Sequence, residues 1–120
     1  MKRRNPNAAI IVIGPSDMSV KEKTEYVTYP YLEAVRDAMK EATISSGCVF
    51  WDMYEVMGGK NSMPKWVNAE PSLASSDYIH FSPKGAKKIA VEFNTKLFEM
   101  YNAYKYPNQK KEKIVNDSIQ

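Results

Sequence analysis

The sequence lacks the features that define several specialised classes of small protein. Its 120 residues contain one cysteine, Cys48, which excludes a disulfide framework. The longest unbroken apolar run, residues 8–13, is far shorter than the roughly 18 residues needed to cross a bilayer, so no membrane span is predicted. A hydrophobic content of 43% exceeds that of a typical disordered chain. We therefore expect a soluble globular domain.

Strong charge of one sign is also missing from the body of the chain. The net charge is +3, but basic residues gather at the two ends, with Lys2, Arg3 and Arg4 at the start and four lysines from Lys105 onward. The body between them carries more acidic than basic residues. Nucleic-acid binding normally needs a basic face, so a nucleic-acid partner is not expected.

The chain also has little that could hold a metal or a phosphate. It has one histidine, and its carboxylates are scattered rather than spaced as zinc or calcium ligands. Gly58-Gly59 lacks the strand and helix that flank a phosphate-binding loop. No metal and no cofactor are expected.

The first half of the sequence predicts a strand, a helix and a second strand. Residues 8–13 are apolar without alternation and end at Gly14-Pro15, as is typical of a parallel strand covered on both faces. Helical spacing follows from Pro30 to about Ser46, with a buried stripe expected at Leu32, Val35, Met39 and Ala42, before a second apolar strand at residues 48–51. Such a unit is most simply parallel.

The second half predicts a loop-rich stretch and one long helix. Short helical turns are expected at residues 53–57 and 63–67. Ser82 and Pro83 form a helix start, and apolar residues then recur at helical spacing to about Tyr101. We expect a domain over residues 1–104 and a polar, frayed tail over 105–120.

Two strands this apolar need neighbouring strands and helices on both faces of their sheet. The chain offers only two such strands and two long helices. Either a partner chain completes the sheet, or the polypeptide corresponds to part of a larger open α/β domain; we favour the second interpretation.

The single histidine, His80, follows Asp77 by three residues and stands just before the long helix. A turn of that length can bring the carboxylate onto the imidazole, where it would fix the tautomer and stabilise the imidazolium formed when the ring accepts a proton. Taken alone, the pair is more often a chance arrangement around a surface or packing histidine.

The surrounding pattern favours catalysis. D-Y-I-H-F-S-P-K-G-A-K-K-I-A, residues 77–90, resembles the last block of the SGNH, or GDSL-type, hydrolases, in which Asp-x-x-His precedes a helix starting with Ser/Thr/Asn-Pro-x-Gly. A-I-I-V-I-G-P-S-D, C-V-F-W-D-M-Y and G-G-K-N-S-M-P-K-W-V extend the resemblance over about residues 8–97. The similarity is greatest to bacterial enzymes related to carbohydrate and peptidoglycan O-acetyl esterases.

The resemblance implies a flavodoxin-like three-layer α/β/α sandwich whose early strands are missing here. It also implies that His80 is a general base, that Asp77 orients it and that the substrate is an acylated carbohydrate or other small ester. Many such bacterial esterases are exported. The family's Gly-Asp-Ser nucleophile block and Gly-x-Asn-Asp block do not occur in the sequence. The chain therefore resembles the C-terminal half of an esterase.

Local side chains offer weak substitutes for the nucleophile. Ser16 follows the first strand, but no strained elbow surrounds it, so a site-rim or turn role is expected. Ser62 could border the substrate, and Trp66 could either offer a wall to a sugar ring or pack in the core. Cys48, within an apolar strand, is expected to be inert.

Two functional hypotheses remain. The first is the histidine half of a serine esterase, inactive alone because it lacks nucleophile and oxyanion hole. The second is a non-catalytic α/β module that binds a partner, or a copy of itself, through an unpaired sheet edge.

Overall fold

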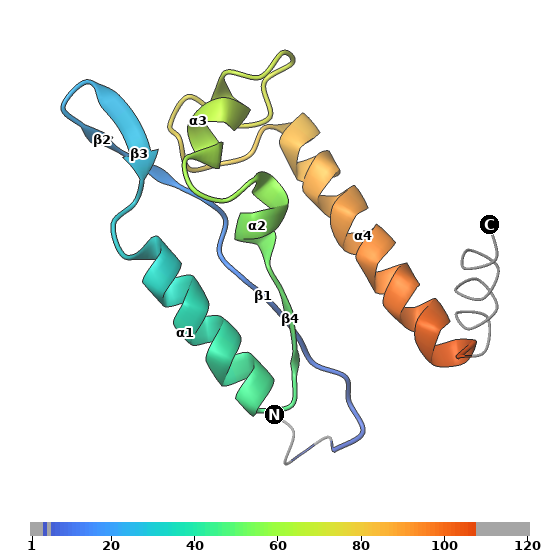
Figure 1. Cartoon of the computed structure of the whole chain (residues 1–120). Helices are drawn as coiled ribbons and strands as arrows, with labels where there is room; N and C mark the ends of the chain where they lie inside the picture. Colours follow the sequence, from blue (N-terminus) through green and yellow to red (C-terminus); the bar gives the residue numbers. More distant parts are fainter. Residues whose placement is uncertain (1–3, 5, 108–120) are drawn as a thin grey trace, which may run out of the picture. The chain divides into compact units, whose positions relative to one another are not determined.

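The computed structural model describes residue 4 and residues 6–107, which form four strands and four helices (Figure 1). In chain order the elements are β1 (Ile11–Ile13), β2 (Ser19–Glu22), β3 (Glu25–Thr28), α1 (Leu32–Ser45), β4 (Val49–Trp51), α2 (Met53–Met57), α3 (Ser62–Val67) and α4 (Pro83–Lys105). No helix among these residues is long and apolar enough to cross a membrane.

The predicted strand, helix and strand are present as β1, α1 and β4. β1 and β4 pair in parallel, with Ile11 opposite Val49 and Ile13 opposite Trp51, and α1 packs against β4. Both strands are shorter than expected, since Ala8 and Cys48 lie outside them. The mixed α/β class with a parallel sheet is confirmed.

The apolar strands of this unit are only partly covered. The unbroken apolar run at residues 8–13 predicts a strand covered on both faces, yet Ile13 is 48% exposed and Val49 on β4 is also exposed, while Trp51 is buried. On α1, Leu32 is buried but Val35 is exposed. The reason is that the described residues supply a sheet of only two strands here, which leaves part of its apolar surface uncovered.

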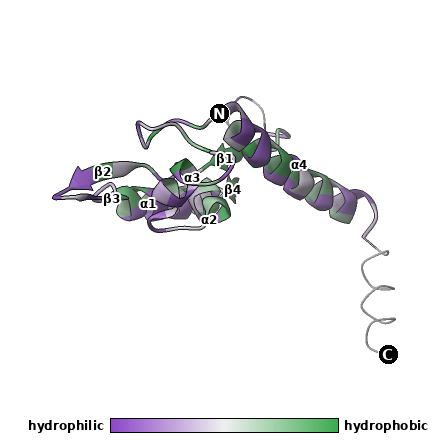
Figure 2. Ribbon diagram, turned by 90° about the horizontal axis from the view of Figure 1, so that it is seen from above, coloured by the Kyte–Doolittle hydropathy of each residue, from purple (hydrophilic) through white to green (hydrophobic). Residues whose placement is uncertain are grey.

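An antiparallel hairpin, β2–β3, was not anticipated. Ser19 pairs with Thr28 and Glu22 with Glu25, and the turn places Lys23 at a φ of 54°. Charged residues dominate its turn, which Figure 2 colours as hydrophilic in contrast to β1. Because the turn lacks the Asn-Gly or Asp-Gly pair that marks tight hairpins, sequence gives no local signal for it.

The core lies around α2 and α3. Met57, Met63, Trp66 and Ala74 are buried together, with Phe81 and Ile89 among the residues packed against them. The indole Nε1 of Trp66 donates to the carbonyl of Met57 at 2.9 Å, so the one polar atom of this side chain is satisfied.

The long helix α4 begins as predicted and ends four residues later than predicted, at Lys105. The Ser82 hydroxyl accepts from the Gly85 amide at 3.1 Å, as an N-cap does. The chain divides into two compact units, residues 1–89 and 90–120, and α4 runs from the first into the second. The remainder of the predicted tail, 108–120, lies outside the described residues.

Candidate active site

The loop between α3 and α4 carries the aspartate and histidine that the sequence singled out. It lies at the side of the first unit where β1 leads toward β2 and β4 leads into α2 (Figure 1). A hydrogen bond from the Ser19 amide to the Tyr78 carbonyl, 2.9 Å long, ties this loop to the chain that follows β1. Ligands of open α/β folds bind at the carboxyl ends of the strands, so this is a suitable place for a site.

Asp77 uses both carboxylate oxygens within four residues. Its Oδ2 lies 2.8 Å from His80 Nδ1. Its Oδ1 accepts from the backbone amides of Ile79, at 2.9 Å, and His80, at 3.0 Å. An ionised carboxylate can only accept, so Nδ1 carries the hydrogen, and in the neutral ring Nε2 keeps its lone pair.

These hydrogen bonds keep Asp77 ionised. The backbone amide of His80, then its ring, then the amide of Ile79 lower the pKa of Asp77 from 3.8 to about 2. All three favour the charged form of the carboxyl group. At neutral pH a full negative charge therefore faces the imidazole.

The pair is open to solvent, with the His80 side chain 76% exposed and that of Asp77 46% exposed. The ring does not point into packed hydrocarbon. Nε2 can accept a proton from a hydroxyl brought to it, but no serine hydroxyl in the described part of the chain is hydrogen-bonded to the ring. Such a pair can serve as a general base and its orienting acid only where a nucleophile is brought to the ring.

The other candidate residues lie elsewhere. Ser16 is half-buried between β1 and β2. Ser62 is 1% exposed, and its hydroxyl donates to Asp17 Oδ2 at 3.3 Å, so it does not border an open site. Trp66 is 6% exposed within the core, which matches the packing alternative and leaves no free face for a sugar ring.

Asp17 is a buried carboxylate whose role sequence reasoning missed. It is fully buried, and its Oδ2 accepts from the Met63 amide at 2.7 Å, so it ties the start of α3 to the segment between β1 and β2. Its Oδ1 has no partner within the described part of the chain. The only sequence signal is an acidic residue four positions after an apolar run.

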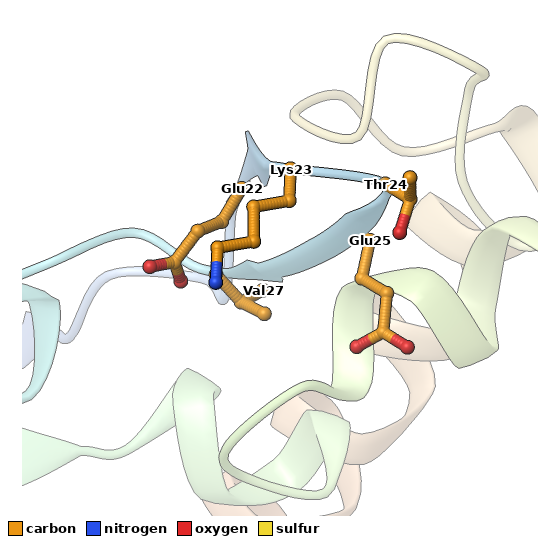
Figure 3. A pocket seen from close by; sticks show the side chains of 5 residues that line it. All are labelled: Glu22, Lys23, Thr24, Glu25 and Val27. Atoms are coloured by element: carbon orange, nitrogen blue, oxygen red, sulfur yellow. The ribbon is translucent and has the colours of Figure 1, made fainter.

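A shallow depression of about 320 Å³ lies at the turn of the β2–β3 hairpin, and neither Asp77 nor His80 lines it. Figure 3 shows its lining side chains, Glu22, Lys23, Thr24, Glu25 and Val27, arranged around the turn. Both signs of charge are present and the charged side chains are exposed, so this depression offers no reaction chemistry.

Metal ligands do not cluster within the described ranges, where no group of three or more His, Cys, Asp or Glu side chains is placed to hold an ion. Cys48 is half-buried just before β4 rather than inside it, and its Sγ lies 3.8 Å from the Ser46 carbonyl.

The chain is similar in sequence and structure to a solved esterase. No protein-family model matches the chain, and no curated protein matches it. A solved structure of a peptidoglycan O-acetylesterase matches with 27% sequence identity and a TM-score of 0.75 over 85% of this chain. The chain has a partial SGNH-type fold.

The similarity to this esterase confirms the predicted resemblance and fold class. The chain spans 29% of the length of the matched esterase. The SGNH-type fold and the loop with Asp77 and His80 together form the basis for a functional proposal.

Proposed function

We propose that this chain supplies the histidine and aspartate of a serine ester hydrolase that removes O-acetyl groups from a carbohydrate-like substrate. The observation that carries the proposal is the 2.8 Å contact between Asp77 and an exposed His80, in a chain similar to a peptidoglycan O-acetylesterase. The serine belongs to polypeptide outside the 120 residues.

In the proposed reaction, His80 Nε2 takes the proton of the serine hydroxyl as the serine oxygen attacks the acetyl carbonyl. The sugar oxygen then leaves with that proton, and the acetyl group remains on the serine. Water attacks this ester next as His80 accepts one of its protons; His80 then returns that proton to the serine oxygen as the acetyl–serine bond breaks, and acetate leaves. Asp77 stabilises the imidazolium in both steps.

The 120-residue chain alone is expected to hydrolyse acetyl esters no faster than buffer. Oxyanion stabilisation contributes the largest share of such catalysis, and the sequence has neither the Gly-Asp-Ser nucleophile block nor the Gly-x-Asn-Asp block of the SGNH hydrolases. Acetate release from an acetylated sugar is the measurement. If the chain alone released acetate, and this activity disappeared in the His80→Ala variant, the proposal that the serine lies on other polypeptide would be wrong.

A chimera tests the catalytic role directly. This chain would replace the matched segment of the O-acetylesterase, which retains its own nucleophile region. A folded chimera is expected to release acetate, and His80→Ala is expected to lower kcat about 100- to 10,000-fold. Lys87→Ala, on an exposed side chain of α4, is the matched control. If the folded chimera released acetate equally fast with and without the His80→Ala substitution, the proposal would be refuted.

The exposed apolar residues of β1 and β4 also fit one alternative, a non-catalytic module that pairs through its sheet edge. Under this alternative, the chimera with His80 intact would be folded but inactive, and association would be the measurable property of the chain.

A further inference from the structure

Tyr78, between the aspartate and the histidine, has a backbone conformation that needs external support. Its φ is 60°, in the left-handed region that an aromatic residue rarely adopts. This conformation turns the chain so that the Asp77 carboxylate reaches the amides of Ile79 and His80 and the His80 ring. Such backbone persists only where surrounding groups hold it.

Two groups from the β2–β3 hairpin hold Tyr78. The Tyr26 ring, on β3, stacks on the Tyr78 ring with centroids 3.5 Å apart and planes 6° from parallel. The Ser19 amide, at the start of β2, donates to the Tyr78 carbonyl at 2.9 Å. The hairpin therefore contacts both the side chain and the backbone of Tyr78.

The hairpin is itself fixed at its base. The Thr28 amide donates to Asn61 Oδ1 at 2.9 Å, and the Asn61 amide donates to Thr28 Oγ1 at 2.7 Å. This reciprocal pair joins the end of β3 to the residue before α3. Because one end of β3 is tied to the core elements in this way, the Tyr26 ring offers a defined surface rather than a mobile one.

We propose that Tyr26 is a positioning residue for His80: its stack on Tyr78 holds the turn in which Asp77 fixes the histidine tautomer with hydrogen on Nδ1. This proposal rests on the proposed function for its biological meaning, since a general base needs its lone pair on Nε2. The hairpin would thus act on the catalytic pair through Tyr78.

The tautomer can be measured directly because the chain has one histidine. In the ¹⁵N-labelled chain at about pH 9, well above the ordinary pKa of an imidazole, the ring nitrogen shifts report where the hydrogen resides. We expect hydrogen on Nδ1 in the unmodified chain. Tyr26→Ala is expected to lower the ratio of the Nδ1–H to the Nε2–H tautomer several-fold.

Two variants control for size and for the hydroxyl. Tyr26→Phe keeps the stacked ring and should retain the original tautomer ratio. Tyr29→Ala removes an exposed tyrosine from the same segment and should also leave the ratio unchanged. An unchanged ratio in Tyr26→Ala, or an equal loss in Tyr26→Phe, would overturn the proposal.

Tyr78→Ala and Tyr78→Gly keep the test decisive if Tyr26→Ala fails to fold. Both variants lose the stack, but a φ of 60° stays strained for alanine and is free of strain for glycine. We expect Tyr78→Ala to lower the tautomer ratio and Tyr78→Gly, which needs no support, to retain it; a retained ratio in Tyr78→Ala would overturn the proposal. The tautomer measurement uses neither ester nor serine. The positioning role of Tyr26 can therefore be refuted while the chimera hydrolyses acetyl esters, and it can be confirmed while the chimera is inactive.

Discussion

At the scale of single residues, the carboxylates of Asp77 and Asp17 differ in burial and in how far along the chain their hydrogen-bond partners lie. Asp77 is exposed and bonded to groups two and three positions along the chain. Asp17 is fully buried and bonded to Ser62 and Met63, 45 and 46 positions away. The Asp77–His80 contact could be predicted from spacing because it is local. The anchor made by Asp17 could not, because its partners are set by the packing of α3 against the chain after β1.

The lowered pKa of Asp77 gives a prediction about pH. A carboxyl group whose pKa in the folded chain lies below its ordinary value stabilises the fold above that ordinary value, and the stabilisation is lost as pH falls through the folded value. For Asp77 these values are 3.8 and about 2. Once the His80 ring is protonated, the amide NMR signals of Ile79 and His80 should therefore keep their positions on further acidification until pH approaches about 2.

Asp77→Asn is the matched control for this titration. Its amide oxygen can still accept from the two backbone amides, but the side chain no longer ionises. The acid transition of the Ile79 and His80 signals should disappear in this variant. A midpoint near 3.8 in the unmodified chain would show that the hydrogen bonds of Asp77 do not form in solution.

At the scale of elements, the start of α4 is fixed by close packing against the loop before it. A Cβ built on Gly85 would lie 1.8 Å from the carbonyl oxygen of Leu73, so backbone occupies the space that any side chain would need. The Ser82 amide donates to the same carbonyl at 3.0 Å, and the Ser82 hydroxyl donates to the Ser72 carbonyl at 2.7 Å. These contacts set where α4 begins relative to His80.

Gly85→Ala is expected to destabilise the chain by about 1–3 kcal/mol, the usual cost of overpacking. Helix propensity alone predicts the opposite, a gain of about 1 kcal/mol for alanine inside a helix. Denaturant unfolding distinguishes the two. Lys87→Ala, exposed on the same helix, should change stability by less than about 0.5 kcal/mol. A more stable Gly85→Ala chain would mean that the Leu73 backbone moves away at little cost.

The elements that sequence predicted well are those with local signals. Ser82 and Pro83 marked the start of α4, and Gly47 marked the end of α1. The β2–β3 hairpin had no such signal, because its turn residues are Lys23 and Thr24 and its side chains are largely charged. Its supports, the Tyr26–Tyr78 stack and the Thr28–Asn61 pair, join segments far apart in the chain.

At the scale of the whole molecule, the first unit has apolar sheet surface without cover. β1 and β4 pair only with each other among the described strands, and Ile13 and Val49 are exposed. Unpaired strand edges with apolar side chains promote association with further strands. Both functional hypotheses need this surface, the esterase for the rest of its sheet and the interaction module for its partner.

The purified chain is therefore expected to self-associate, with a sedimentation coefficient that rises with protein concentration. Ile13→Lys should weaken this association because it places a charge on the exposed sheet surface, where pairing would bury it. Ile79→Lys is the matched control, since Ile79 is 46% exposed, close to the 48% of Ile13, but lies in the loop with His80. If the chain stayed monomeric at all concentrations, or if both substitutions weakened its association equally, the exposed sheet surface would not be the site of association.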